Sequence, residues 1–388
     1  MENKIKKVFL YPSEFSLHSA YKTLLSNSPK GYNFSYSYNR NSLFEKFKNY
    51  SALKKLYRFI VQITGIDLSQ KIVKHDSVPK DTDLVFSMGI IYNGSKPWVI
   101  DILDNPYSLS GYNYNLFIKN KKDIEKKLLE GNCKAVICAN ESSLNLMKKH
   151  FSKKLIKKIR LLRPAVAFSD KFSKREEQKV FQILFMGSTK NPEDFYIKGG
   201  LETIKCFEKL SEKYNNLKLV IRCSVPPEVK SQIVNNPKIQ IIENRISDEE
   251  LENLYLNSQV LSCPAHIYML MSWLESMSHG LPIVALDTYA SKDYIKDNIN
   301  GFLIKPSKNI PYDNPSYPVN VRSLEFIDAI KKVDYRVIQD LCVSFEKLIN
   351  NEKLRKTMGE NNVHLIKQKF SIETRNRELK KFLDKLSI

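Results

Sequence analysis

The chain has 388 residues, of which 42% are hydrophobic and 27% charged, and its formal net charge is +20. This length is too great for one ordinary hydrophobic core and predicts two domains of about 170 to 200 residues each. No run of eighteen apolar residues and no signal-peptide segment occur, which argues against an integral membrane or secreted protein and predicts a cytoplasmic location.

Short apolar runs alternate with segments of helical periodicity along most of the chain. Such alternation is typical of parallel sheets covered by helices, so the predicted fold class is α/β. Pro164 precedes a charged stretch of weak periodicity, which predicts a linker after the first domain. The expected strands are residues 7–10, 84–88, 98–103, 135–139, 183–186, 217–221, 239–242, 259–263 and 281–285.

The first domain is expected to be the basic one, because residues 1–170 carry +15 of the net charge. Basic runs at residues 119–127 and 153–160 would attract phosphate-rich partners, either an anionic membrane surface or nucleic acid. Residues 51–66 place five apolar side chains on one helical face beside lysines. Such a helix either packs on a core or lies in a membrane interface, and both interpretations remain open.

Two patterns that can bind metal ions have simpler explanations here. The acid-x-acid triplet Asp81-Thr82-Asp83 precedes a predicted strand, whereas a metal and nucleotide site would need it after the strand, so a turn is expected. The six cysteines lack the paired spacing of metal ligands and are expected to be free, buried thiols. We therefore predict no metal site.

Residues 264–306 are the most informative segment of the chain. An apolar strand ends at Pro264, a short helix is predicted over residues 271–279, and an apolar strand follows. The start of a helix presents unpaired N–H groups and partial positive charge, so the amides near Leu270 and Met271 are a predicted phosphate site. Glu275, one turn into the helix, is placed to bind a sugar hydroxyl.

The run ESMSHGLPIV at residues 275–284 resembles the motif of retaining glycosyltransferase family 4, also called glycosyl transferases group 1. The resemblance implies the GT-B fold, in which two Rossmann-like domains face a central cleft. The family motif has another acid eight residues before the Glu, but Ile267 stands there in this chain. The loop that starts at Pro264 is also one residue shorter than is usual in the family.

A second block of resemblance begins with an apolar strand at residues 180–186. In the family, the end of this strand and a following Lys-Gly pair hold the diphosphate of the donor. The resemblance therefore implies that Gly187, Ser188, Lys198 and Gly199 bind the donor. A lysine suits this place because a compact cation stabilises the negative charge that develops on a leaving diphosphate.

The family usually places an Arg directly after the Gly that ends this strand, but this chain has Ser188 there. Lys190 and Arg222 are the alternative cations. Arg222 closes the strand LKLVIR, and open parallel sheets bind ligands beyond the carboxyl ends of their strands.

A third block, residues 246–265, resembles the acidic helix and strand that precede the Glu-bearing unit. It implies that Arg245 and Ile246 lie near the base of the donor. His266 either contacts the donor sugar or caps its loop. His18, in the loop after the first strand, has either a catalytic, acceptor-side role or the role of an ordinary turn residue.

The resemblance implies a division into residues 1–165 (acceptor-side domain), 166–179 (linker), 180–370 (nucleotide-sugar-binding domain) and 371–388 (a helix packing back on the first domain). It predicts a metal-independent retaining hexosyltransferase without a cofactor, in which Lys198, Glu275 and His18 act in catalysis. The expected substrates are a nucleotide-sugar and a glycan or lipid-linked acceptor in cell-surface polysaccharide or glycolipid synthesis. An anionic membrane is a further expected partner.

Two alternatives belong to other classes of protein. The missing first acid and the missing Arg are compatible with a degenerate GT-B protein that acts as a non-catalytic partner or scaffold. The net charge and the 20 Tyr and 20 Phe residues are compatible with a nucleic-acid-binding protein. No zinc, helix-turn-helix or RNA-binding signature accompanies that charge, so nucleic acid is not an expected partner.

Overall fold

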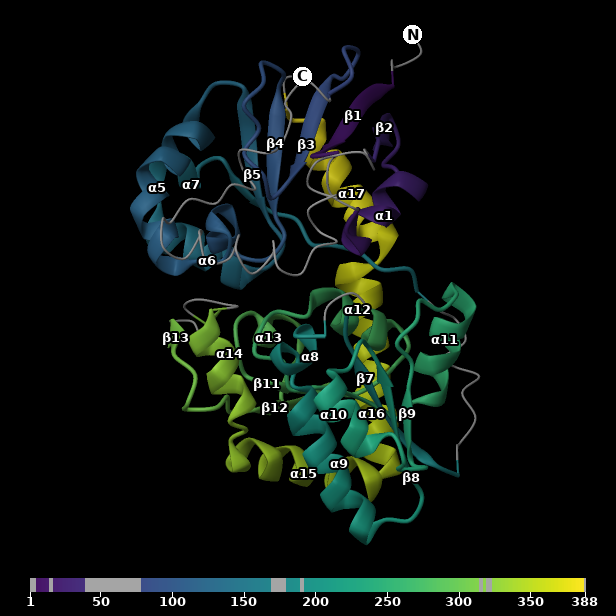
Figure 1. Ribbon diagram of the computed structural model, residues 1–388. Helices are drawn as coiled ribbons and strands as arrows, with labels where there is room; N and C mark the ends of the chain where they lie inside the picture. Colours follow the sequence, from purple (N-terminus) through teal and green to yellow (C-terminus); the bar gives the residue numbers. More distant parts are fainter. Residues whose placement is uncertain are drawn as a thin grey trace. The chain divides into compact units, whose positions relative to one another are not determined.

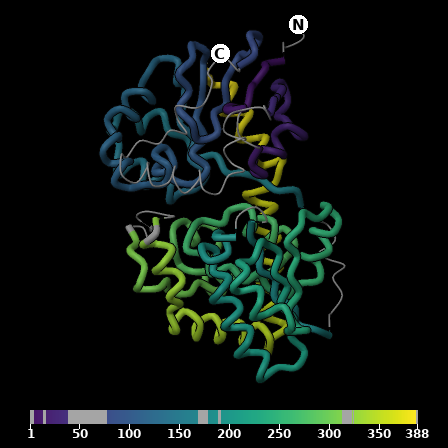
Figure 2. Tube along the Cα trace, viewed as in Figure 1, coloured from purple at the N-terminus to yellow at the C-terminus, as the bar shows by residue number. Residues whose placement is uncertain are grey.

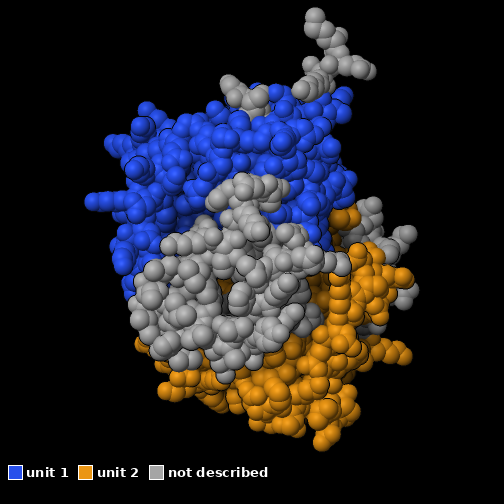
Figure 3. Space-filling model, turned by 45° about the horizontal axis from the view of Figure 1, so that its top comes forward, with its two compact units in different colours: residues 1–165, 319–321, 370–388 blue, residues 166–318, 322–369 orange. Residues whose placement is uncertain are grey.

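A computed structural model of the protein describes residues 5–13, 17–38, 78–168, 179–188, 192–313, 317–318 and 323–386. The chain forms two units, which are coloured separately in Figure 3: unit 1 comprises residues 1–165, 319–321 and 370–388, and unit 2 comprises residues 166–318 and 322–369. The chain therefore begins and ends in unit 1, as the trace in Figure 2 shows. The segment at residues 51–66 lies outside the described residues.

Unit 1 is built on a six-stranded parallel sheet in the order β2-β1-β3-β4-β5-β6. Its strands are β1 (Lys6–Tyr11), β2 (Tyr32–Ser35), β3 (Leu84–Met88), β4 (Trp98–Ile102), β5 (Cys133–Cys138) and β6 (Ile159–Leu161) (Figure 1). Its helices are α1 (Ser19–Ser26), the 3-10 helix η2 (Pro106–Ser110), α5 (Tyr114–Leu129), α6 (Glu141–His150), α7 (Lys153–Ile156) and α17 (Ile372–Leu383).

The C-terminal helix α17 belongs to the core of unit 1 although it lies more than 200 residues away from the unit's other elements in the sequence. Leu379 and Leu383 are fully buried in one cluster with Leu24 of α1 and Phe86 of β3. Arg375, itself buried, donates hydrogen bonds to the hydroxyl and the carbonyl of Thr23 at 3.1 and 3.2 Å. Apolar burial and these bonds together fix α17 beside α1.

Unit 2 is built on a second six-stranded parallel sheet, in the order β12-β11-β10-β7-β8-β9. Its strands are β7 (Phe181–Met186), β8 (Leu217–Arg222), β9 (Ile239–Ile241), β10 (Val260–Cys263), β11 (Ile283–Leu286) and β12 (Gly301–Ile304), with a small pair β13 (Tyr312–Asp313) and β14 (Tyr317–Pro318). Its helices are α8 (Asp194–Ile197), α9 (Gly200–Lys213), α10 (Pro227–Ile233), α11 (Asp248–Asn257), α12 (Leu270–Ser278), α13 (Ser291–Tyr294), α14 (Leu324–Lys331), α15 (Tyr335–Ile349) and α16 (Glu352–Leu365), followed by the π-helical turn η4 (Ile366–Phe370).

The sheet of unit 2 has a topological switch point at β7. The strands that follow β7 in the chain lie on one side of it, as β8 and β9, and the later strands β10 to β12 lie on the other side. In open parallel sheets, ligands bind beyond the carboxyl ends of the strands at such a point, because the connections diverge there and leave a crevice. The order of the strands therefore favours a site at the ends of β7, β8 and β10.

The two parallel sheets confirm the predicted α/β class, and all nine predicted strands occur. Five strands were not predicted: β2, β6 and β12, which are edge strands, and the small pair β13 and β14. β2 (YNFS) and β6 (IRL) alternate buried with exposed residues. An edge strand buries less of its surface than a central one, so these two lack the apolar run that marks a central parallel strand. β12 (GFLI) is buried at three of its four residues, so this reason does not apply to it.

The acid-x-acid triplet and the cysteines have the simple roles that the sequence predicts, a turn before a strand and free thiols. Asp81 and Asp83 lie before β3, where Asp81 pairs with the Lys7 ammonium at 2.5 Å and Asp83 accepts from the Lys7 backbone N–H at 2.7 Å. The six cysteines are free, and five of them are buried. Within the described ranges, no helix is long and apolar enough to cross a membrane.

Unit 1 contains one buried acid whose charge should make stability depend on pH. Asp101, in β4, is 7% exposed, and one of its carboxylate oxygens has no hydrogen-bond partner among the described residues. Burial raises its pKa to about 7, and the hydrogen bond from Tyr21 opposes this rise. Since an unfolded Asp has a pKa of about 3.9, the folded state binds the extra proton between about pH 4 and 7, and stability should fall as pH rises through this window.

Replacing Asp101 with asparagine is therefore expected to stabilise the protein more at pH 8 than at pH 5. The difference should be on the order of 2–4 kcal/mol, since the amide needs no proton and can still accept from Tyr21. Urea unfolding followed by circular dichroism at both pH values measures it. Asp123→Asn, at an exposed position of α5, is the matched control and should show no such difference. Equal effects of Asp101→Asn on stability at the two pH values would contradict a raised pKa of Asp101 in the folded protein.

Candidate functional site

The Lys198-Gly199 turn joins α8 to α9 and is pressed against the loop that follows β10. Gly199 has a φ of +81°, and a Cβ atom at this position would lie only 2.3 Å from the Pro264 carbonyl oxygen. The His266 backbone N–H also donates to the Ile197 carbonyl at 2.9 Å. Glycine is required at residue 199 for both reasons, its conformation and the close approach of Pro264. The turn thereby holds Lys198 near the end of β10.

The charge of Lys198 acts on two buried thiols. Burial raises the pKa of Cys223 to about 12 and that of Cys263 to about 11, and the charge of Lys198 opposes both shifts. Cys223 directly follows β8, and Cys263 ends β10, which are the two neighbours of β7 in the sheet. The half-buried Lys198 therefore lies at the carboxyl ends of these strands, at the switch point.

Arg222 brings a second cation to the same end of the sheet. The Gly187 N–H donates to the Arg222 carbonyl at 2.9 Å, and the Ser188 carbonyl accepts from the Ser224 N–H at 2.9 Å. The Arg222 side chain is half-buried, and its Nε is buried without a hydrogen-bond partner within the described part of the chain. A buried, unpaired guanidinium donor is costly, which favours a ligand that accepts from it.

Glu275 lies in α12 as predicted and is held by a residue that sequence reasoning missed. The Tyr255 hydroxyl, from α11, donates to Glu275 Oε2 at 2.9 Å, and the Tyr255 ring stacks on His279 with 4.8 Å between centroids. Burial raises the pKa of Tyr255, the charge of Glu275 adds to this rise, and the charge of Arg222 opposes it. Arg222 and Glu275 are thus both close to Tyr255, on neighbouring elements of the site.

The start of α12 has the features expected of a phosphate site. Its N-cap residue, Met269, makes no side-chain hydrogen bond to the first turn, which begins with the buried Leu270 and the half-buried Met271. The first N–H groups of a helix have no partners within the helix. Their partial positive charge therefore lies in the segment that directly follows β10 and its loop.

His266 is buried in a network that was not predicted. It is 1% exposed, its Nε2 lies 3.1 Å from Glu202 Oε1, and its Nδ1 lies 3.3 Å from the Tyr312 hydroxyl. Glu202, in the first turn of α9, is 3% exposed, and its Oε2 has no partner among the described residues. Glu202 falls on the same helical face as the buried Cys206 and Leu210, so the signal available in the sequence was an acid at an apolar position.

For the remaining predicted residues, only local positions are described. His18 belongs to unit 1, where it is exposed and accepts from the Ala20 N–H through Nδ1 at 3.2 Å, as the N-cap of α1. Arg245 is exposed and Ile246 half-buried, in the segment that precedes α11. Lys190 lies outside the described residues. Within the described ranges, no group of three or more His, Cys, Asp or Glu side chains is placed to hold a metal ion.

Comparison with known proteins supports the resemblance noted in the sequence. Residues 180–311 match the family model described as glycosyl transferases group 1, and no curated protein sequence matches the chain. The crystal structure of HepE from Anabaena in complex with UDP and glucose is similar, with 14% identity, a TM-score of 0.62 and coverage of 98% of this chain and 100% of HepE.

Two further structures have a TM-score of 0.57. WaaG, a glycosyltransferase involved in lipopolysaccharide biosynthesis, is 13% identical and is matched over 96% of this chain and 98% of its own. The pneumococcal O-GlcNAc transferase GtfA, in complex with UDP and GlcNAc, is 14% identical and is matched over 85% of this chain and 59% of its own. The chain therefore has the fold of GT-B glycosyltransferases, and its residues 180–311 match the model of glycosyl transferases group 1.

Proposed function

We propose that this protein is a retaining glycosyltransferase that moves a hexose from a nucleotide-sugar to a hydroxyl group of a glycan or lipid-linked acceptor. The observation that carries the proposal is the place of Lys198, Arg222 and Glu275 after β7, at the end of β8 and after β10, with the Lys198-Gly199 turn held against Pro264 and Glu275 bound by Tyr255. Two cations and one acid at a switch point suit a ligand with a diphosphate and free hydroxyl groups.

Each group has a distinct role in the proposed donor complex. Lys198 and Arg222 stabilise the diphosphate, and the first amides of α12, at Leu270 and Met271, bind its oxygens. Glu275 accepts hydrogen bonds from the ribose hydroxyls, and Tyr255 fixes the orientation of its carboxylate. The segment with Arg245 and Ile246 lies beside the base.

In the proposed reaction, the bond between C1 of the sugar and the phosphate oxygen breaks, and its electron pair leaves with the diphosphate. The acceptor hydroxyl forms the new bond to C1 from the same face, and its proton passes to an oxygen of the leaving diphosphate. Lys198 and Arg222 supply the positive charge that this step requires, and the anomeric configuration is retained. Unit 1 would provide the acceptor side, with His18 as the proposed residue of that unit.

The absence of the family's first acid favours one alternative. Ile267 is half-buried at that place, and an isoleucine cannot accept a hydrogen bond from a sugar. A degenerate GT-B protein that binds a partner without catalysis would tolerate this change. The unpartnered Arg222 Nε among the described residues favours ligand binding in either protein, so turnover of the donor is what separates the two.

Slow hydrolysis of the donor tests the proposal without knowledge of the acceptor. The purified protein is incubated with UDP-glucose, GDP-mannose and related donors, and proton NMR records the first anomer of the released sugar. Release of a nucleoside diphosphate together with the anomer present in the donor supports retaining transfer. Release of the opposite anomer would contradict retention, and binding of a donor without any turnover would favour the non-catalytic alternative.

A further inference from the structure

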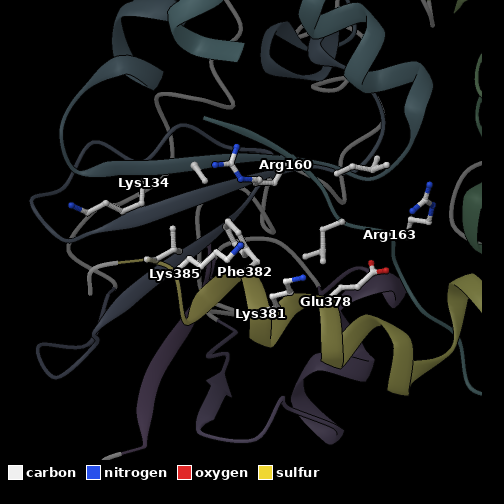
Figure 4. A pocket seen from close by; sticks show the side chains of 11 residues that line it. Lys134, Arg160, Arg163, Glu378, Lys381, Phe382 and Lys385 are labelled. Carbon is white, nitrogen blue, oxygen red and sulfur yellow. The ribbon is translucent and has the colours of Figure 1, made fainter. Parts of the chain in front are cut away.

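A groove of about 320 Å³ lies within unit 1 (Figure 4). One wall consists of α17 and the residues that follow it, including Lys381, Phe382 and Lys385. The other wall is the edge of the sheet, with Lys134 at the start of β5 and Arg160 on the edge strand β6. The groove therefore runs between the free edge of a sheet and the C-terminal helix.

The lining of this groove carries a strong excess of positive charge. Five of its side chains are cations, and Glu378 is the single acid. Arg163 pairs with Glu141 at 3.2 Å, whereas Arg160 donates only to backbone carbonyls, of Lys157 at 2.8 Å and of Ile159 at 2.7 Å. Within the described part of the chain, Lys134, Lys381 and Lys385 form no ion pair. The positive charge of the groove is therefore largely uncompensated.

The floor of the groove is apolar and continues into the core of unit 1. Ala135 and Leu162 belong to the buried cluster that holds α17, and Phe382 and Leu386 pack against this cluster while staying half-buried. An apolar floor between two cationic walls matches a ligand with a hydrocarbon part and an anionic head. Lysine suits this position since its stem can follow an apolar chain while its ammonium reaches a phosphate.

We propose that this groove binds an anionic phospholipid of a membrane leaflet, with the phosphate between the cations and the start of one acyl chain on Phe382 and Leu386. A cluster of cations combined with insertion of an apolar group supplies the two contributions that stable attachment of a protein to a membrane needs. Nucleic acid fits less well, because its backbone offers no hydrocarbon chain for the floor. The proposal does not depend on the chemistry of the donor site.

Binding to vesicles tests the contribution of the charges. The full chain is sedimented with vesicles of phosphatidylglycerol and phosphatidylcholine, or of phosphatidylcholine alone, and binding is expected only to the former. Lys381→Gln with Lys385→Gln should weaken the partition coefficient by about 30-fold, because each lysine near an anionic surface contributes about fivefold. The control is Lys292→Gln with Lys296→Gln, which has the same charge change and spacing at exposed positions of unit 2, outside the basic runs, and its effect should stay within about threefold. Equal losses in both double variants would overturn the proposal.

A fluorescent side chain on the floor tests the apolar contact. The native tryptophans, Trp98 and Trp273, are at most 1% exposed, so Phe382→Trp adds the reporter that the groove needs. Phosphatidylglycerol with brominated acyl chains should quench this tryptophan and leave the wild-type emission unchanged. Vesicle binding without quenching would show that no acyl chain enters the groove. Loss of oligonucleotide binding in the Lys381 and Lys385 variant, without vesicle binding by the wild type, would assign the groove to nucleic acid.

Discussion

Replacing Lys198 with alanine is expected to lower kcat for sugar transfer about 100- to 1,000-fold, the usual cost of losing one group that stabilises charge developing in a transition state. The Lys198 ammonium lies at the ends of the strands that flank β7, where the leaving diphosphate is proposed to sit. The loss should fall mainly on kcat, since the charge of the diphosphate increases as the bond to the sugar breaks. Initial rates of nucleoside diphosphate release measure it.

The matched control for this variant is Lys205→Ala, because Lys205 lies on the exposed face of α9, seven residues further along the chain. It should leave both kcat and KM within about twofold of the wild type. If Lys198→Ala and Lys205→Ala have the same activity, Lys198 does not act on the diphosphate and the proposed site is wrong.

Replacing Glu275 with glutamine is expected to weaken donor binding by about 10- to 100-fold, as for the loss of hydrogen bonds to a charged group. Stability should change little, because the glutamine amide still offers an oxygen to the Tyr255 hydroxyl. Isothermal titration calorimetry with the nucleoside diphosphate and with its sugar measures the effect. Free ribose hydroxyls are common to both ligands, so both affinities should fall together.

Tyr255→Phe separates the binding role of Glu275 from a structural one. This change removes the donor that holds the carboxylate at 2.9 Å but leaves the carboxylate itself in place. Donor affinity should fall by less than about tenfold, whereas the free energy of unfolding should fall by about 1 kcal/mol. If Tyr255→Phe weakens donor binding as much as Glu275→Gln does, the ribose contact attributed to Glu275 is not supported.

The central strands of both sheets were predictable from the sequence because each is buried on two faces. β4 (WVIDI) and β7 (FQILFM) are buried at every residue, and an apolar run interrupted only by Asp101 in β4 and by Gln182 in β7 expresses this directly. The edge strands β2 and β6 carry no such run. The helix α12 was predictable to within one residue at each end, since Gly280 ends it and adopts a φ of +66° that favours glycine.

The residues of the proposed donor site were predicted where a motif or a strand end names them. Lys198 and Glu275 follow from the resemblance and Arg222 from its place at a strand end, but Tyr255 and Glu202, which contact Glu275 and His266, were not predicted. Tyr255 lies 20 residues before Glu275, and Glu202 lies 64 residues before His266. Contacts between elements so far apart in sequence are set by the packing of helices on the sheet, and a single sequence contains no local pattern for them.

The groove in unit 1 could not be foreseen for a related reason. Lys134 and Lys385 are unremarkable surface cations in the sequence, and they meet Arg160 only because α17 returns to the first unit and packs beside β5 and β6. The basic run at residues 153–160 contains Arg160 and indicated an anionic partner, but it did not indicate that α17 forms the opposite wall.

Thermal shift of the purified protein with UDP, GDP, ADP, CMP and their sugars tests the central claim most directly, because stabilisation by a ligand requires binding to the folded state. The screen is run on the wild type, Lys198→Ala, Glu275→Gln and the control Lys205→Ala. We expect one nucleotide and the corresponding nucleotide-sugar to stabilise the wild type and Lys205→Ala, but neither Lys198→Ala nor Glu275→Gln. Absence of a shift with every ligand, or equal shifts in all four proteins, would contradict a nucleotide-sugar site at the ends of β7, β8 and β10.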